Sequence, residues 1–341
     1  MIQTIRFAQT GGPEVLFEEQ IAEPEEPGKG QVLIQQHAIG LNFIDTYYRK
    51  GIYAAKLPSG LGNEAAGTVL ATGPDVSRFR PGDRVCYAGG SSTLGAYCSA
   101  RIIAQDVLLK IPDRVSYETA AASTLRGLTA AYLLHRMWPL KSGDTVVIYS
   151  AAGGVGLILV QWAKILGLEV IGVVSDDRKA VLAQDHGCDH VLRSSSMDLA
   201  EQIRLLTNGQ GAEVVFDSVG QKTFQISLNS VRRRGLLVCY GASSGPIPPF
   251  DLIQLAQKGS LYITRPTLAD YIANPEERDT LAALWFDLLE REAIKVHIEH
   301  RYPLSAAAQA HQVLESGRTA GSGILIPDQL FMKMAPHALH L

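Results

Sequence analysis

The stretch Gly143–Ser175, GDTVVIYSAAGGVGLILVQWAKILGLEVIGVVS, decides the fold. Residues 145–149 form a short apolar run rich in β-branched side chains, typical of a strand buried on both faces of a parallel sheet. A small, glycine-rich segment follows, and apolar residues then recur at helical spacing over 155–166 until Gly167 ends the helix. A second apolar run over 170–174 completes a strand, loop, helix and strand.

The loop of this unit carries a dinucleotide-binding pattern. Residues 151–156 read AAGGVG, which fits G-x-G-x-x-G except that Ala151 replaces the first glycine. Gly153 would let the backbone approach a pyrophosphate, and Gly156 would let the helix pack closely on the strand. The phosphates would meet unpaired N–H groups at the start of the helix. The alternative is a glycine-rich turn of another α/β unit, but the position between a strand and a helix favours the nucleotide.

The chain before this unit is rich in short strands. β-forming residues cluster over 14–21, 31–38, 67–71 and 84–88, and Gly-Pro turns separate them. Many short strands without long intervening helices predict a compact barrel-like module over residues 1–125, interrupted by a short helix over 43–50.

From residue 126 strands alternate with helices. Expected strands cover 145–149, 170–174, 190–192, 213–217, 236–240 and 261–264, and this alternation predicts an α/β domain with a doubly wound parallel six-stranded sheet over 126–265. The tail, residues 266–341, carries a long helix, a further helix and a last strand, and we expect it to return to the first domain. Residues after 327 are expected to form a loose end.

Composition excludes several classes of protein. The 341 residues suffice for two cores, and 46% hydrophobic with 19% charged residues is typical of a globular protein. We expect no membrane span and no signal peptide, and therefore a cytoplasmic protein. The formal charge of −3 gives no electrostatic case for nucleic acid as a partner. The four cysteines and nine histidines are dispersed without ligand spacing, so no metal is predicted.

The end of the second strand of the unit bears on the cofactor. An NAD enzyme places an acid there for the ribose hydroxyl, and an NADP enzyme a basic residue. Ser175 is neutral at the expected position, and Arg178 and Lys179 lie within reach of a 2′-phosphate, which favours NADP. Asp176 or Asp177 could be an NAD-type acid if the strand ended one residue later, and Lys179 could be a solvated residue of the helix.

Several segments together resemble one family. They are Gly11–Leu16, Gly40–Asp45, Leu61–Gly67, Pro81–Val85, Gly127–Ala130, Ala151–Gly156, Asp217–Gly220 and Gly323–Ile326. Across nearly its whole length the chain is similar to the NADPH:quinone oxidoreductases of the zinc-free, ζ-crystallin-like branch of the medium-chain dehydrogenase/reductase superfamily. The resemblance implies a GroES-like β-barrel catalytic domain beside a Rossmann NADP-binding domain. It also implies NADPH as cofactor, a quinone as substrate, and a homodimer or tetramer built through the nucleotide domain.

The resemblance also accounts for the absent metal. Zinc-dependent relatives carry a ligand cysteine where this chain has Asn42 and a ligand histidine where it has Asn63. Neutral amides are poor zinc ligands compared with thiolate and imidazole. Hydride transfer is therefore expected to proceed without a metal.

Carried over residue by residue, the resemblance implies a set of site residues. Asn42 would hydrogen-bond near the nicotinamide, Tyr47 and Tyr53 would line the quinone pocket, and Arg265 would face the interdomain cleft. Each has a structural alternative: helix capping for Asn42, packing for the tyrosines and a salt bridge for Arg265. The cofactor would be held by Asn42, Thr129, Gly153, Gly154, Val155, Gly156, Ser175, Lys179, Val219, Gly241, Ala242, Ser243 and Arg318. Two departures concern the phosphate pocket: Ser194 stands where bacterial members have a tyrosine, and Arg318 is shifted by one residue.

The sequence thus predicts an NADPH:quinone oxidoreductase in which NADPH delivers hydride to a quinone in the interdomain cleft. One alternative is an NADPH-dependent reductase of α,β-unsaturated ketones or aldehydes on the same scaffold. The other, of a different class, is an NADPH-gated RNA-binding or crystallin-like protein.

Overall fold

In the computed structural model, which describes residues 1–24 and 26–334, the chain divides into two units. The first unit combines residues 1–128 with 272–341, and the second holds residues 129–271. The sequence-based boundaries lie at 125/126 and 265/266, so each observed boundary falls a few residues later. Each unit has its own buried core.

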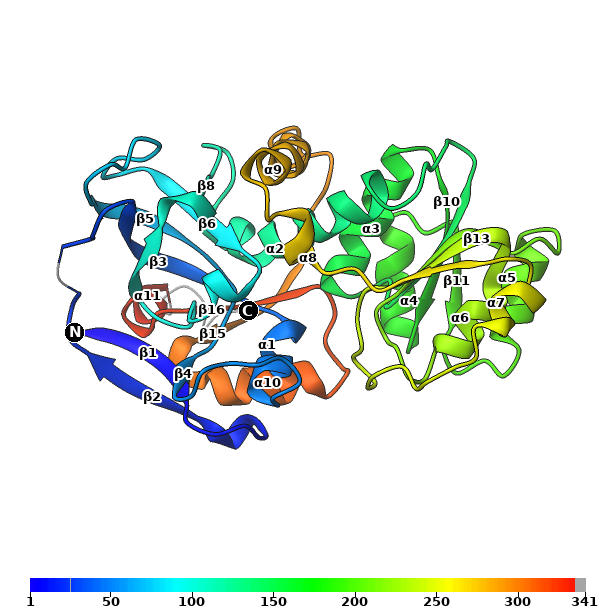
Figure 1. Ribbon diagram of the computed structural model, residues 1–341, viewed down its shortest axis with the longest axis horizontal. Coiled ribbons are helices and arrows are strands. Elements are labelled where there is room, and N and C mark those ends of the chain that lie inside the picture. The colour runs from blue at the N-terminus through cyan, green and yellow to red at the C-terminus, as the bar shows by residue number, and fades with distance from the viewer. Residues whose placement is uncertain (25, 335–341) are drawn as a thin grey trace. The chain divides into compact units, whose positions relative to one another are not determined.

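The second unit is a parallel sheet covered by helices (Figure 1). Within the described chain its six strands have the order β11-β10-β9-β12-β13-β14, all paired in parallel. The strands are buried apolar runs, and helices connect them. The strand bounds are β9 (Thr145–Tyr149), β10 (Glu169–Val174), β11 (His190–Arg193), β12 (Ala212–Asp217), β13 (Val231–Cys239) and β14 (Tyr262–Thr264). The helices are α3 (Gly154–Ile165), α4 (Asp177–Asp185), α5 (Leu199–Leu206), α6 (Phe224–Ser230), α7 (Ile253–Gln257) and α8 (Leu268–Tyr271), and α2 (Tyr117–His135) enters from the first unit.

The first unit is built on two sheets. Over the described residues, the larger runs β15-β16-β3-β5-β6-β8 with β7 also paired to β3, and the smaller has the order β2-β1-β4. The strands are β1 (Ile2–Phe7), β2 (Leu16–Ile21), β3 (Gln31–Leu41), β4 (Ser59–Gly60), β5 (Glu64–Thr72), β6 (Arg84–Ala88), β7 (Ala100–Ala104), β8 (Leu109–Lys110), β15 (Ile298–Pro303) and β16 (Ser322–Ile326). The helices are η1 (Pro13–Val15), α1 (Phe43–Arg49), η2 (Ser91–Thr93), η3 (Gln105–Val107), α9 (Pro275–Glu290), η4 (Leu304–Ala306), α10 (Ala307–Glu315) and α11 (Asp328–Met334).

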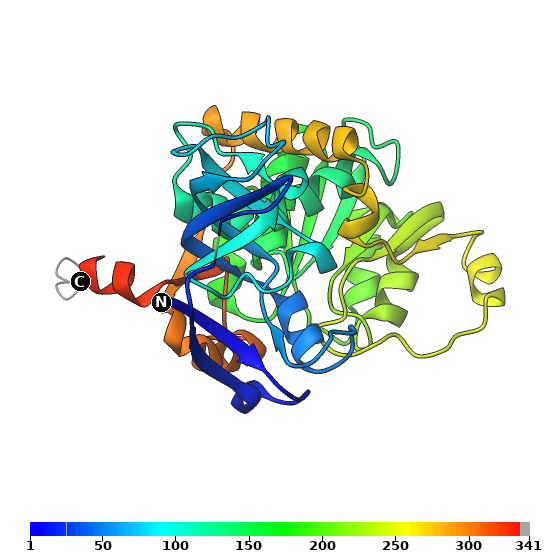
Figure 2. The same ribbon diagram turned by 60° about the vertical axis from the view of Figure 1, so that its left-hand side comes forward.

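The C-terminal segment completes the larger sheet. Strand β16 pairs antiparallel with β3, and helix α9 packs on α2, where a Cβ at Gly127 would lie 2.2 Å from Cδ2 of Trp285. The backbone N–H of Asp328 donates to Oε1 of Gln3 at 3.1 Å, which holds the start of α11 beside β1 (Figure 2). The expected loose end after 327 is therefore wrong as far as 334, because α11 forms there; residues 335–341 lie outside the described chain.

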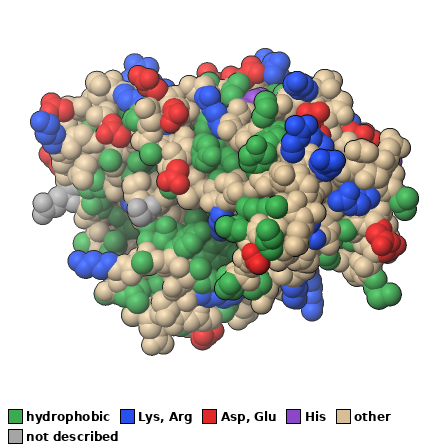
Figure 3. Space-filling view, turned by 45° about the vertical axis from the view of Figure 1, so that its right-hand side comes forward, with side chains coloured by type: hydrophobic (Ala, Val, Ile, Leu, Met, Phe, Trp, Pro, Cys, Tyr) green, Lys and Arg blue, Asp and Glu red, His purple; other side chains and the backbone are tan. Residues whose placement is uncertain are grey.

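The distribution of charged and apolar residues has two aspects, one on the surface and one along the helices. On the face drawn in Figure 3, Asp and Glu side chains are scattered, and several Lys and Arg side chains lie near one another at the right of the view. Among the described residues, no helix combines the length and the apolar character needed to cross a bilayer.

Candidate active site

The carboxyl ends of the parallel strands gather most of the predicted nucleotide-binding residues of the second unit. The chain forms β9 first, moves outward to β10 and β11, and returns to place β12 on the other side of β9. The strand order thus reverses between β9 and β12, and ligands of doubly wound sheets bind outside the carboxyl ends at such a reversal. The loops after β9, β10, β12 and β13 all leave this edge.

The glycine loop packs α3 tightly against β9. A Cβ at Gly156 would lie 2.1 Å from the carbonyl oxygen of Ser150, so no larger residue fits without moving backbone. Ser150 takes the left-handed conformation, with φ 53°, at the start of the loop. Ala151 is fully buried and does not have a positive φ, and Gly172 of β10 leaves room for its methyl group. Ala151 therefore replaces the first glycine of the pattern without blocking the turn.

The start of α3 fits a pyrophosphate. Gly153 is the N-cap residue and has no side chain that could bind the first backbone N–H groups. A helix N-terminus without such a cap presents N–H donors and a partial positive charge to an anion. A Cβ at Gly153 would lie 3.1 Å from the oxygen of Ser150, a close but not prohibitive contact. Gly154, Val155 and Gly156 form the first turn that would hold the phosphates.

The end of β10 carries the residues on which the sequence left alternatives open. The strand ends at Val174, and Asp176 is the N-cap of α4. Its Oδ1 accepts from the backbone N–H of Lys179 at 3.0 Å and its Oδ2 from the Ser175 hydroxyl at 2.8 Å. The bond from Lys179 N–H is the main reason that the pKa of Asp176 lies below its ordinary value. Asp176 thus serves the helix, and Nζ of the nearly buried Lys179 donates to Ser175 Oγ at 3.2 Å.

The loops after β12 and β13 pack on each other. Asp217 accepts from the backbone N–H groups of Val219 and Gly220 at 2.7 and 3.1 Å and shapes the first loop. Ser243 N donates to Ser218 O at 3.2 Å, and a Cβ at Gly241 would lie 2.5 Å from the same oxygen. The structure therefore brings Val219 together with the turn of Gly241, Ala242 and Ser243.

The remaining predicted residues of the second unit lie apart from these loops in the sequence. Thr129 is buried in α2, a helix that begins in the first unit. Arg265 follows the end of β14, is exposed, and donates from Nη1 to the carbonyl oxygen of Pro266 at 3.1 Å.

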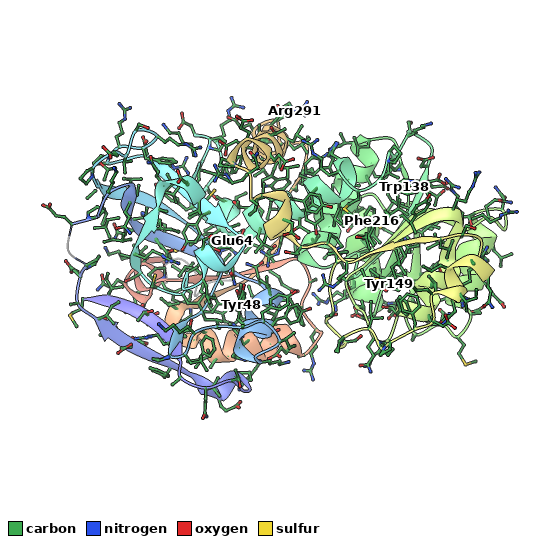
Figure 4. All side chains as sticks on the ribbon, in the orientation of Figure 1. Tyr48, Glu64, Trp138, Tyr149, Phe216 and Arg291 are labelled. Atoms are coloured by element: carbon green, nitrogen blue, oxygen red, sulfur yellow. The ribbon has the colours of Figure 1, made fainter. Side chains whose placement is uncertain are left out.

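In the first unit, Asn42 stands at the start of α1 and is almost completely buried. Its Nδ2 donates to Oε2 of Glu64 at 2.8 Å, while its backbone N–H donates to Asp45 Oδ2 at 3.0 Å. The other oxygen of Glu64 accepts from Leu125 N at 2.6 Å, and Nη1 of Arg126 lies 3.6 Å from Oε2. Figure 4 shows Glu64 inside the first unit. The Asn42 side chain also takes part in a capping box with Asp45 at the start of α1, so the capping role weighed for it from the sequence is present. An amide oxygen has two lone pairs, so the carbonyl oxygen keeps one that the capping bond does not use.

The second amide, Asn63, is bound to the other buried carboxylate. Asn63 Nδ2 donates to Asp45 Oδ1 at 2.9 Å, and the Tyr97 hydroxyl donates to Asp45 Oδ2 at 3.0 Å. Burial raises the pKa of Asp45 to about 6 and that of Glu64 to about 7, although hydrogen bonds and Arg126 oppose both shifts. Each amide at a zinc-ligand position of the relatives is thus tied to an acid.

The network continues into the C-terminal helix α10. Nη1 of the buried Arg49 donates to His311 Nδ1 at 3.0 Å, because a guanidinium can only donate. His311 Nε2 therefore carries the proton and donates to the Tyr97 oxygen at 3.0 Å. Burial, reinforced by the Arg49 charge, lowers the pKa of His311 to about 3, so the ring is neutral. Glu315 Oε2 accepts from Arg49 at 2.6 Å.

Sequence reasoning missed Glu64, Asp45, Tyr97 and His311 as parts of this network. A signal exists for the two acids, since each lies in a segment with one of the amides, Gly40–Asp45 and Leu61–Gly67. No local signal exists for His311, which lies 214 residues from Tyr97 in the chain.

The predicted tyrosines form one cluster. The rings of Tyr47 and Tyr53 lie edge to face with centroids 5.5 Å apart, and both side chains are half-buried. Tyr47 contacts Phe43 and Tyr53 contacts Tyr48 in the same manner. Arg318 also belongs to the first unit, where it is exposed after α10. Asn42, Tyr47, Tyr53 and Arg318 thus come from the first unit, and the other predicted residues come from the second.

The donor set does not suit a metal. Across residues 1–24 and 26–334, no three His, Cys, Asp or Glu side chains are grouped so that they could hold an ion. The amide nitrogens of Asn42 and Asn63 donate to Glu64 and Asp45, so both buried carboxylates already accept hydrogen bonds.

The two units and the glycine loop together define a dehydrogenase/reductase with a nucleotide fold. Two family models match accordingly: an alcohol dehydrogenase GroES-like domain over residues 28–113 and a zinc-binding dehydrogenase over residues 154–291. A quinone oxidoreductase of Pseudomonas aeruginosa is 48% identical over 328 residues, which covers 96% of this chain and 100% of that protein.

Two further relatives bear on the cofactor and the substrate. The crystal structure of Escherichia coli quinone oxidoreductase complexed with NADPH has a TM-score of 0.92 at 44% identity and covers 95% of this chain and 100% of that one. A 2-haloacrylate reductase from a Burkholderia species is 39% identical over 334 residues, 96% of this chain and 99% of that protein. The chain belongs to the quinone oxidoreductase family of the medium-chain dehydrogenase/reductase superfamily and is an oxidoreductase. The predicted family and fold class are confirmed.

Proposed function

We propose that this enzyme uses NADPH to reduce quinones, without a metal. The observation that carries the proposal is the combination, in one unit, of an uncapped glycine-rich helix start with a nearly buried lysine beside Ser175. The first suits a pyrophosphate, and the second suits a 2′-phosphate. The relatives named quinone oxidoreductase, and the NADPH held by one of them, support the same assignment.

The second unit would hold the cofactor. Gly153 to Gly156 receive the pyrophosphate, and Ser175 and Lys179 receive the 2′-phosphate. Val219, the turn 241–243 and Thr129 line the rest of the cofactor, with Arg265 towards the nicotinamide end. Arg318 of the first unit adds a further cation. When bound, NADPH supplies a hydride.

The first unit would supply the substrate groups. Negative charge develops on a quinone oxygen as it is reduced, and donors that are already in place stabilise that charge. The Tyr47 and Tyr53 hydroxyls are such donors. A tyrosine hydroxyl in water has a pKa of about 10 and is protonated at neutral pH. We therefore assign Tyr47 the role of hydrogen-bond donor rather than that of a proton-donating acid. The Asn42 carbonyl, oriented by Glu64, is an acceptor for an amide such as that of nicotinamide.

The metal-free assignment depends on the two amides. Asn42 donates an N–H group to Glu64, and Asn63 donates one to Asp45. Because both carboxylates already accept these hydrogen bonds, we do not assign them as ligands of an ion. Charge on the substrate is therefore stabilised by hydrogen bonds alone in this proposal. A homodimer, a cytoplasmic location and the absence of a nucleic-acid partner stay predictions.

A second candidate is reduction of an activated carbon–carbon double bond. The relative named 2-haloacrylate reductase favours it, because its name describes an α,β-unsaturated acid. The same residues would serve, with the tyrosines bonding a carbonyl or carboxylate oxygen in place of a quinone oxygen.

An acceptor panel tests the proposal. Purified enzyme is mixed with NADPH or NADH and with 1,4-benzoquinone, a naphthoquinone, an enone or 2-chloroacrylate under nitrogen, and cofactor oxidation is followed by absorbance. We expect the largest kcat/KM with NADPH and a quinone. Faster turnover of the enone or the acrylate would favour the second candidate, and inhibition by a zinc chelator would contradict the metal-free assignment.

A further inference from the structure

The ends of β10 and β11 lie side by side in the second unit. The strands pair in parallel, with Val174 opposite Arg193, and the backbone N–H of Ser194 donates to Val174 O at 2.8 Å. Arg193 is therefore the last residue of β11, and it lies beside the end of β10, which is followed directly by Ser175. Ser175 and Lys179 are the residues proposed above for the 2′-phosphate.

Arg193 is oriented but incompletely bonded. Its guanidinium forms an ion pair with Asp177 through Nη2, and 28% of its side chain is exposed. Among the described side chains, Arg193 Nη1 is one of the few buried polar atoms with no hydrogen-bond partner. A buried N–H donor without an acceptor is unfavourable, so this atom favours an acceptor oxygen beside it.

Its ion-pair partner can be replaced. The side chain of Asp177 is fully exposed, and ion pairs with exposed carboxylates contribute little to stability. A phosphate monoester carries about 1.5 to 2 negative charges and offers three acceptor oxygens, more than one exposed carboxylate provides.

Arg193 also decides the local charge. Residues 176–179 are two acids followed by two bases, whose formal charges cancel. Arg193, reaching this edge from the next strand, makes the group net positive.

We propose that Arg193 binds the 2′-phosphate of NADPH together with Lys179 and determines the preference for NADPH over NADH. This inference rests on the proposed cofactor. It adds to that proposal a residue outside the set that the family resemblance implies, and it assigns the exposed Asp177 as a carboxylate that the phosphate displaces.

Calorimetric titration of the full-length protein tests it without turnover. The probes are 2′,5′-ADP and 5′-AMP, which differ only in the 2′-phosphate, followed by NADPH and NADH. In Arg193→Ala we expect 2′,5′-ADP and NADPH to bind about tenfold to a hundredfold more weakly, because hydrogen bonds to charged groups are the strong ones. Binding of 5′-AMP and NADH should change less than about twofold.

Arg233→Ala is the matched control, since Arg233 is an exposed arginine near the amino end of β13, at the opposite edge of the sheet. It should bind all four probes as the wild type does. Arg193→Met, which keeps the aliphatic stem, replaces the alanine variant if thermal melting shows that the latter is unfolded. Equal affinity of wild type and variant for 2′,5′-ADP overturns the inference and leaves the proposed function intact. Failure of the wild type to bind NADPH overturns the proposed function itself.

Discussion

Asn42 and Glu64 form a buried pair in which the amide nitrogen donates to the carboxylate at 2.8 Å. The pair joins the start of α1 to the start of β5 and fixes which face of the amide is available to a ligand. In the proposed function, the Asn42 carbonyl oxygen is oriented towards the ligand only while the side chain at position 64 accepts the hydrogen bond from the Asn42 amide nitrogen.

The substitution Glu64→Gln is expected to reverse the Asn42 amide. The glutamine would keep its oxygen for Leu125 N–H and turn its amide nitrogen towards Asn42, which must then rotate to accept. We expect kcat for quinone reduction to fall about 10- to 100-fold, as for a misplaced group at a reacting centre, while the variant still unfolds in one cooperative transition. Steady-state kinetics measures it. Glu118→Gln, which alters a half-buried surface carboxylate paired with Arg301, is the control and should keep full activity.

Glu64 should also make stability depend on pH. Its pKa rises on folding from 4.5 to about 7, so the native state binds the proton more tightly than the unfolded state. The stabilisation is complete below pH 4.5 and is lost as pH rises through about 7. Urea unfolding at several pH values should show wild type losing stability relative to Glu64→Gln over this range. Parallel curves for the two proteins would contradict the assignment.

His311 should stay neutral and structurally essential. His311→Gln removes the ring that joins Arg49 to Tyr97, leaving two buried groups without their partner geometry, and should lower the free energy of unfolding by about 2–4 kcal/mol. His190→Gln, at a position where the side chain is 40% exposed, should change it little. In wild type, nitrogen chemical shifts should report the Nε2–H tautomer of His311 and no titration between about pH 5 and 8. A protonated ring at about pH 6 would refute the arrangement.

Two glycines of the loop should differ in tolerance. A methyl group at Gly156 would lie 2.1 Å from the Ser150 oxygen, whereas one at Gly153 would lie 3.1 Å from it. Gly156→Ala should lose about 1–3 kcal/mol of stability through overpacking, together with measurable NADPH binding. Gly153→Ala should retain the fold with weaker binding. Chemical unfolding and cofactor fluorescence titration compare them, and equal stability of the two variants would count against the packing argument.

The tyrosine pair should act on turnover rather than on cofactor binding. The double variant Tyr47→Phe, Tyr53→Phe keeps both rings and their edge-to-face contact but removes both hydroxyls. We expect kcat with quinone to fall about tenfold or more while the Kd for NADPH is unchanged. The wild-type rate in the double variant would show that neither hydroxyl takes part.

The second unit was largely predictable because its information is local. Strands 145–149, 170–174 and 213–217 appear within a residue of their expected bounds, as runs of buried β-formers between glycine turns. The expected strand 236–240 is wrong at its start: β13 begins at Val231, because the arginines 232–234 carry no apolar signal. Strands β1 and β7 of the first unit were missed. For β7 the reason is that it pairs with the distant β3, which is not a local property, whereas β1 pairs with the next strand in the chain, β2.

The candidate site was predictable only in part. Motif spacing located the glycine loop, and the structure shows why Ala151 is tolerated there: Gly172 on the neighbouring strand makes the room. The resemblance to the family also pointed to Asn42 and Asn63. The acids they bind and the orientation of each amide arise from contacts between β5, α1 and α2, which one-dimensional spacing does not encode.

The ring of His311 bears on how the protein is made. A ribosome releases α1, with Arg49, long before it releases α10, and β3 likewise waits for β16 to cover one edge. Until α10 emerges, the Arg49 guanidinium, which is buried in the folded protein, lacks the His311 ring to which it donates. The first unit therefore closes only after α10 has emerged, by which time the second unit, contiguous in sequence, has been able to fold by itself.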